Sequence, residues 1–294
     1  MSGLILQSLL AGLTNGLIYA LIGLGIAAIF KGSDIVNAMQ GEFGTMAAIV
    51  TSLLMAAQGW PYWLAGFCGL SVGLIFGVII EFVLVRPMRR RDAPHDSYLL
   101  LTLGLSITFS ALILYVAGSE SYKLPGFGGD RVWIILNAVV PEQSLWLLGC
   151  GVAIILATRW FFGRTSLGLR MMAAAIDADG AATIGVNVPL MRTITFGLGG
   201  ILGSAAGLLI ATSIPLDYHT GLILTLKGFA AAILGGITNP IGAAVGGITI
   251  GVLEAASIIS ISSAYKDVVT FALLIVIMIF LPNGMLGKAR RAGG

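Results

Sequence analysis

Charged side chains are scarce in this chain. Asp, Glu, Lys and Arg make up 10% of its 294 residues, whereas they make up about 25% of ordinary soluble domains. Hydrophobic residues make up 57%, and the mean hydropathy is +1.00. A soluble core of this length does not need so much apolar surface, so most of the chain must face lipid or helices that do. The composition therefore predicts an α-helical membrane protein.

Cysteine and histidine are nearly absent, with two residues of each. Cys68 and Cys150 lie in separate apolar runs without the spacing of metal ligands, and we interpret them as small buried hydrophobes. His95 and His219 fall in expected loops, so we expect no metal site and no metal-dependent catalysis. The sequence also lacks a Walker A motif, because its nearest match ends at Lys288 without a following Ser or Thr. We therefore expect the chain to bind no cofactor and to be no enzyme.

The basic residues do not form the single stripe that is typical of nucleic-acid binding. The formal net charge is +3, but the basic side chains lie in short loops between apolar runs, so no nucleic-acid partner is expected. The first apolar run, 4–30, is too long for a signal peptide and long enough to cross a bilayer.

Nine apolar segments follow one another along the chain. They predict an all-α, polytopic membrane protein of about nine (eight or nine) transmembrane segments, with residues 1–294 forming one domain. Two of the segments leave open whether they cross fully, because 36–57 opens with polar residues and 222–237 carries Lys227. The nine segments are 4–30, 36–57, 61–85, 98–117, 143–163, 191–212, 222–237, 241–259 and 267–281.

The basic residues also predict the orientation, because Lys and Arg near span ends are held on the cytoplasmic side. With the amino terminus outside and the carboxyl terminus inside, twelve of the sixteen basic residues fall inside and three outside. In this orientation the loop 118–142 lies outside and the loop 164–190 lies inside.

Polar residues crowd the start of the second segment, where they are costly in lipid and must face protein, water or a solute. Asn37, Gln40 and Glu42 lie here. We predict that they line a polar path together with two small polar residues of the fourth segment, Thr102 and Ser106. For Glu42 a second interpretation stays open, a structural carboxylate bonded to a neighbouring helix.

Two further carboxylates lie inside predicted spans, Glu81 and Glu254. We interpret both as hydrogen-bonded packing residues rather than as proton relays. Glycines spaced four residues apart predict close helix packing. These glycines are Gly199, Gly203 and Gly207 in one segment, and Gly242, Gly246, Gly247 and Gly251 in another.

The loop 164–190 is too polar to span a membrane, but its alanine-rich centre favours helix. We therefore predict short helices at the cytoplasmic face, where a partner ATPase can bind them. An ordinary connecting loop stays open as the alternative interpretation. The residues assigned to this coupling role are Asp177, Asp179, Gly180, Ala181, Ala182 and Gly185.

Six ordered motifs resemble those of the permease family of ABC importers for branched-chain amino acids, in particular its LivH-like members. The resemblance runs nearly from end to end. The motifs are Val36–Phe43, Val85–Arg89, Leu103–Ser106, Asp177–Asn187, Leu234–Gly235–Gly236–Ile237 with Pro240–Ala243, and Leu281–Gly287.

This resemblance implies a permease in the inner membrane of a bacterium that works in a larger assembly. The implied partners are a second permease, two ATPase subunits that use ATP and Mg, a periplasmic substrate-binding protein and membrane lipid. Ala38, Met39 and Gln40 replace the family's usual Phe, Ala and His beside Glu42. The resemblance and this departure together imply a branched-chain amino acid as substrate, or a related solute such as urea, an amide, or an organic or aromatic acid.

Two other classes of protein stay open on the residues alone. One is an ion-coupled secondary transporter or a channel subunit, which the carboxylates in spans fit loosely because Glu42 and Glu81 lie toward predicted inner ends. The other is a membrane enzyme, which would need a clustered polar site at the bilayer surface.

Overall fold

The computed structural model describes residues 2–127, 131–135, 138–260, 266–281 and 284–286. Three residues of the last motif, Pro282, Asn283 and Gly287, lie outside these ranges. The basic residues Lys288, Arg290 and Arg291 also lie outside them.

Helices account for most of the described chain. One of them is interrupted by a π-helix, Glu81–Val85, which joins α3 to α4 without a break in direction. The helices are α1 (Ser2–Ser33), α2 (Gln40–Gln58), α3 (Tyr62–Ile80), α4 (Arg86–Arg89), α5 (His95–Ala117), α6 (Glu142–Arg164), α7 (Ser166–Ile176), α8 (Ala178–Thr183), α9 (Val188–Ala211), α10 (Thr220–Gly235), α11 (Pro240–Ser260) and α12 (Lys266–Phe280).

Six helical stretches of the described chain are long and apolar enough to cross a membrane. They are Leu6–Ser33, Tyr62–Arg89, Asp96–Ala117, Glu142–Arg164, Val188–Ala211 and Pro240–Ile258. The prediction of a polytopic helical membrane protein is confirmed. The three other predicted segments, 36–57, 222–237 and 267–281, correspond to α2, α10 and α12, which do not meet the same criteria of length and hydropathy. Of these, α10 has 16 residues and α12 has 15.

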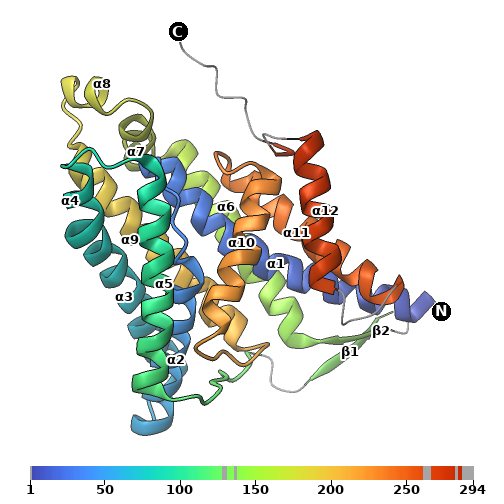
Figure 1. Ribbon diagram of the computed structural model, residues 1–294. Helices are drawn as coiled ribbons and strands as arrows, with labels where there is room; N and C mark the ends of the chain where they lie inside the picture. The colour runs from blue at the N-terminus through green and yellow to red at the C-terminus, as the bar shows by residue number, and fades with distance from the viewer. Residues whose placement is uncertain (1, 128–130, 136–137, 261–265, 282–283, 287–294) are drawn as a thin grey trace.

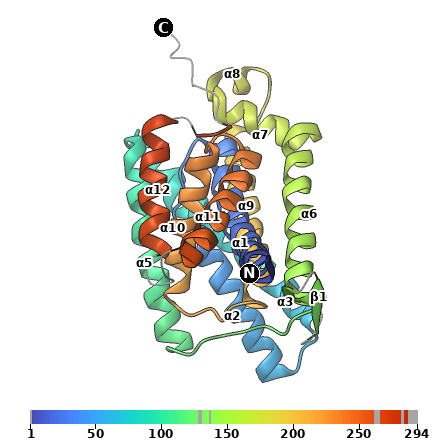
Figure 2. The ribbon, with the colours of Figure 1, turned by 90° about the vertical axis from the view of Figure 1, so that its right-hand side faces the viewer.

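The two ends of the bundle differ. At one end, the α7–α8 end, α7 and α8 lie beyond the long helices, and the last turns of α12 reach the same level (Figures 1 and 2). The carboxyl end of α1 lies here too, since Lys31 stands 5.7 Å from the ring centroid of Phe162 in the last turn of α6. At the opposite end lie two strands, β1 (Val132–Ile135) and β2 (Ala138–Pro141), and we name it the hairpin end.

The strands were not part of the all-α interpretation, which treated 118–142 as a loop. β1 and β2 pair antiparallel, with Trp133 opposite Val140 and Ile134 opposite Val139. The residues are β-branched or aromatic, types that favour strands, but four residues are too few for the sequence to separate a strand from a short apolar run.

Glycine allows the central helices to touch backbone to backbone. A Cβ on Gly207 of α9 would overlap the backbone of Gly44 in α2, and one on Gly200 would overlap Gly73 of α3. The spaced glycines of α11 likewise face α1, where a Cβ on Gly251 would meet Gly16. Close approach of this kind is how helices associate in lipid, where burial of apolar surface gives no driving force. The predicted packing role of the glycines is confirmed.

A buried polar triad joins α1, α10 and α11. The Nζ of Lys227 lies 3.0 Å from Oε1 of Glu254, and it donates a hydrogen bond of 2.9 Å to the hydroxyl of Tyr19. Tyr19 in turn donates to Oε2 of Glu254 at 2.7 Å. Breaking a buried ion pair costs about 3–5 kcal/mol. The triad therefore fixes the rotation of α10 against its two neighbours, and Glu254 has the packing role expected of it.

We predict that Gly207→Ala destabilises the protein by about 1–3 kcal/mol, because the new methyl group overpacks the crossing of α2 and α9. Gly104→Ala is the matched control, because a Cβ there meets nothing within 4 Å. Thermal melting of the two variants in detergent is the measurement. Equal melting temperatures would show that the α2–α9 crossing does not need glycine.

Candidate functional site

The chain between α1 and α2 is not helical, although it is buried in the bundle. Residues 34–39 lead from the α7–α8 end of α1 back to the first turn of α2. Asp34 starts this segment with a φ of 56°. Ile35, Asn37 and Met39 are each at most 1% exposed. Irregular backbone is tolerated at membrane depth only where protein or a wet cavity satisfies its polar groups.

Side chains from neighbouring helices satisfy the backbone of this break. Thr102 of α5 accepts a hydrogen bond of 3.1 Å from the amide of Ala38. Thr225 of α10 accepts one of 2.8 Å from the amide of Gly41. The segment also stabilises itself, since the Asn37 Oδ1 accepts from the amide of Met39 at 3.1 Å. The break therefore ties α2 to both α5 and α10.

Glu42 lies in the first turn of α2 and is completely buried. Its Oε1 accepts a hydrogen bond of 3.0 Å from the hydroxyl of Ser106, one turn beyond Thr102 on α5. Its carboxylate also faces Gly221 of α10, where a Cβ would come within 2.6 Å of it. A carboxylate at a helix amino terminus is stabilised by the helix dipole. Glu42 is thus held between α2, α5 and α10, with glycine leaving it room.

Three polar atoms of this region are buried without a hydrogen-bond partner among the described residues. They are Nδ2 of Asn37, Oε1 of Gln40 and Oε2 of Glu42. A buried polar group that lacks a partner costs about 1–3 kcal/mol. These atoms surround a helix break, and broken helices of this kind form the binding sites of many transporters.

The five residues predicted to line a path do not share one face. Asn37, Glu42, Thr102 and Ser106 belong to the contact of the break and α2 with α5. Gln40 points to the other side, where its Nε2 donates to the carbonyl of Gly199 in α9 at 2.9 Å. All five are 0% exposed. Thr225 and Gly221 also belong to this region but were not predicted. A threonine two residues before Lys227 in an apolar segment was an available signal for the first of them.

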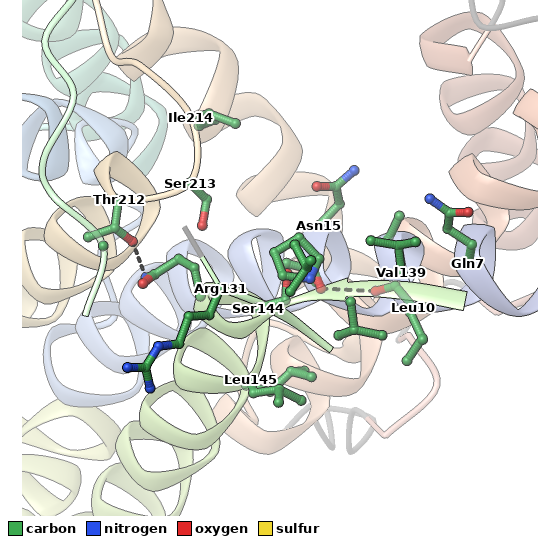
Figure 3. A pocket seen from close by; sticks show the side chains of 18 of the residues that line it. Gln7, Leu10, Asn15, Arg131, Val139, Ser144, Leu145, Thr212, Ser213 and Ile214 are labelled. Carbon is green, nitrogen blue, oxygen red and sulfur yellow. Dashed lines mark hydrogen bonds between the residues drawn. The ribbon is translucent and has the colours of Figure 1, made fainter. Parts of the chain in front are cut away.

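A separate cavity of about 1020 Å³ lies at the hairpin end (Figure 3). The first half of α1, the hairpin, the start of α6 and the residues that follow α9 enclose it. None of the five predicted path residues lines it. Its polar lining consists of Gln7, Thr14, Asn15, Lys123, Arg131, Gln143, Ser144, Thr212 and Ser213.

At the opposite end, the loop 164–190 folds into α7 and α8, as predicted. Thr165 caps α7, and Asp177 caps α8 by accepting a 2.9 Å hydrogen bond from the amide of Gly180. Gly185 follows α8 with a φ of 85°, a conformation that glycine adopts without strain. The two helices are therefore rigidly connected.

The residues assigned to coupling take different positions on this unit. Ala181 is 4% exposed and packs toward α7 and α9, and Gly180 is half-buried against the Asp177 carboxylate. Asp177, Asp179, Ala182 and Gly185 are exposed. Two isoleucines that were not predicted are the most exposed large hydrophobic side chains here, Ile176 at 84% and Ile184 at 77%.

The arrangement defines a class of protein, a multi-pass membrane protein with a polar helix break inside the bundle and a rigid helical unit at one end. A family model described as "Branched-chain amino acid transport system / permease component" matches residues 8–278. The chain belongs to this family, and its role is that of a permease component.

Individual relatives agree with this assignment. The high-affinity branched-chain amino acid transport system permease protein LivH of Escherichia coli K12 is 30% identical, with 96% of each chain covered. BraD of Pseudomonas aeruginosa, also named a branched-chain amino acid permease protein, shows the same identity and coverage. The autoinducer 2 import system permease protein LsrC of Yersinia pestis is 28% identical over 79% of this chain and 63% of its own.

Among solved structures, PsaBC from Streptococcus pneumoniae in complex with Fab is similar in fold. The TM-score is 0.52 at 12% identity, over 91% of this chain and 90% of the other. The polytopic fold is thus shared well beyond detectable sequence similarity.

We predict that Ser106→Ala destabilises the protein by about 1–3 kcal/mol, because it removes the hydroxyl donor from a buried carboxylate. Thr108→Ala is the control, since Thr108 lies on the exposed face of the same helix and bonds only to the carbonyl of Gly104. The change in melting temperature is compared in detergent. If both variants melt alike, the Glu42–Ser106 bond does not hold α5 to α2.

Proposed function

We propose that the chain is a permease subunit of an ATP-driven importer of the inner membrane. Its substrate is a branched-chain amino acid or a related small polar solute. It forms half of the translocation pathway with a second permease, two ATPase subunits supply the energy, and a periplasmic binding protein delivers the solute. Membership in the permease family and the names of the relatives support this proposal.

The observation that carries the proposal is the exposed apolar surface at the α7–α8 end. Ile176 and Ile184 flank α8 and expose 84% and 77% of their surfaces. Both lie outside the six stretches that can span a membrane, so they are not the lipid-facing side chains of a span. Large aliphatic side chains in such a position are typical of a protein-binding surface. A capped helix pair beneath them can transmit the motion of an ATPase into the bundle, because it does not deform.

The break between α1 and α2 supports the proposed position of the pathway. Glu42, with Asn37, Thr102 and Ser106, offers buried polar groups at the contact between α2 and α5. Only 17% of the 18-residue apolar window of α5 is buried inside the protein, whereas 78% of the corresponding windows of α1 and α9 is buried. A thinly covered helix beside buried polar groups is the part of the bundle that can move aside. Gln40 takes a separate role, holding α2 against α9.

The carboxylates argue against the ion-coupled alternative. Glu254 is neutralised by Lys227, and Glu81 accepts a 2.7 Å hydrogen bond from Thr193 of α9. A relay for protons or cations through the membrane needs several carboxylates that can change their charge. Glu42 alone does not make such a relay.

We expect Ile176→Asp and Ile184→Asp each to release the ATPase, because a charge placed in an apolar contact is desolvated without a partner. Ile134→Asp is the matched control. Ile134 is 75% exposed, but it lies on β1 at the hairpin end. The permease is purified with its ATPase, and both retention and stimulated hydrolysis are measured. Full retention in both α7–α8 variants would remove the coupling role.

The orientation belongs to the same proposal, with the amino terminus periplasmic and the carboxyl terminus cytoplasmic. The described basic residues at the α7–α8 end outnumber those at the hairpin end, which favours the former as cytoplasmic. Those at the α7–α8 end are Lys31, Arg86, Arg89, Arg90, Arg91, Arg159, Arg164, Arg170 and Arg192, against Lys123, Arg131 and Lys266.

We expect a cysteine at Ala182 to be protected from a membrane-impermeant thiol reagent in spheroplasts, and a cysteine at Ser119 to react. Both positions are exposed, so a difference reports the side of the membrane rather than burial. The background replaces the native Cys68 and Cys150. Labelling of position 182 from outside would reverse the orientation.

A further inference from the structure

A group of arginines lies between α4, α5 and α9 at the α7–α8 end. Two of them, Arg89 and Arg192, each have a buried Nε that finds no acceptor among the described residues. Arg89 donates through Nη2 to the carbonyl of Ser33 at 3.2 Å, and its guanidinium stands 5.8 Å from the ring centroid of Tyr98. A guanidinium carries five N–H donors and no acceptor. Donor capacity thus exceeds what the surrounding protein accepts.

Positive charges outnumber negative ones at this place. Arg86, Arg89 and Arg192 stand against two carboxylates, Glu81 and Asp34, which follows Ser33 in the chain. Arg89 repels Arg192, and Glu81 attracts it. Glu81 also accepts the hydroxyl of Thr193. Arg86 adds a third cation one turn before Arg89. Like charges in a half-buried site destabilise one another unless an anion joins them.

Apolar surface adjoins the cationic group. Ile79, Phe82 and Val83 are 45%, 58% and 56% exposed, on the end of a stretch that can span the membrane. The guanidinium of Arg86 stands 5.3 Å from the ring centroid of Phe82, which joins the cationic and apolar surfaces. A ligand that satisfies both must carry an anionic head and an apolar chain.

The π-helix Glu81–Val85 produces this arrangement. It buries Glu81 against Thr193 of α9 and leaves the next two residues, Phe82 and Val83, facing outward. Short π-helical insertions in α-helices are frequent at functional sites.

We propose that Arg89 and Arg192 bind the phosphate of an anionic phospholipid from the leaflet at the α7–α8 end, with its acyl chains against Ile79, Phe82 and Val83. The phosphate supplies the missing acceptors in the bidentate geometry that guanidinium groups prefer. The lipid then joins α4 to α9 and balances the excess positive charge. The site is separate from the helix break and from the exposed isoleucines beside α8.

The test is retention of phosphatidylglycerol by the permease, purified with its partner subunits and examined by native mass spectrometry. The double variant Arg89→Gln/Arg192→Gln is expected to lose binding about tenfold or more, because charge-assisted hydrogen bonds are lost. The matched control is Arg90→Gln/Arg91→Gln, which removes the same charge from exposed positions of the turn that follows α4. Wild type and control should both prefer phosphatidylglycerol over phosphatidylcholine.

Equal loss of phosphatidylglycerol in the variant and the control would overturn the proposal, because it would show that positive charge attracts the lipid without a specific site. Two further results would overturn it. One is binding of inorganic phosphate without phosphatidylglycerol, and the other is loss of the ATPase with lipid binding unchanged. Lipid retention is measured without transport, so failure of the importer assignment and failure of this proposal can be told apart.

If the Gln variant does not fold, Arg89→Lys/Arg192→Lys replaces it, with a several-fold loss of lipid binding expected because an ammonium group cannot form the bidentate contact of a guanidinium. Wild-type retention in that variant would contradict the proposal.

Discussion

The backbone of residues 34–39 cannot be left without hydrogen bonds inside a membrane, and much of the structure answers this constraint. Water is absent from the hydrocarbon core, so its amides must find partners in the protein or in a wet cavity. Thr102 of α5 supplies such a partner to Ala38 in this segment, and Thr225 of α10 supplies one to Gly41 in the first turn of α2. These two helices are thereby placed on either side of the start of α2, where Glu42 lies. The position of the candidate pathway is thus a consequence of how the break is satisfied.

The three carboxylates inside the bundle have three different environments. Glu254 belongs to a neutral triad with Lys227 and Tyr19, and it holds helices together. Glu81 bonds to α9 and lies next to an arginine. Glu42 has one hydroxyl donor, and its other oxygen has no partner in the part of the chain that the structure describes. Composition alone marks all three as costly, but only their surroundings separate the two structural carboxylates from the one proposed to border the pathway.

The sequence predicted the helices and the close-packing glycines well, because both depend on local patterns. Hydropathy over about 20 residues determines a span, and glycines four residues apart occupy one helix face. The α7 and α8 helices followed from alanine content. The sequence did not predict the direction in which the Gln40 side chain points, because that direction depends on how α2 is rotated against α9. Ala181 faces inward for a similar reason, namely the tertiary fold of α7 onto α9. The π-helix at Glu81 has no local signal that we recognise.

The length of α1 links the protein to the thickness of its bilayer. With 32 residues, α1 is about 48 Å long at 1.5 Å per residue, well beyond a hydrocarbon core of about 30 Å. It crosses the bundle obliquely (Figure 1), which is how a long helix relieves hydrophobic mismatch. Its tilt is coupled through Tyr19 to α10 and α11. A thinner or thicker membrane would therefore act on the α10–α11 pair through the angle of one helix.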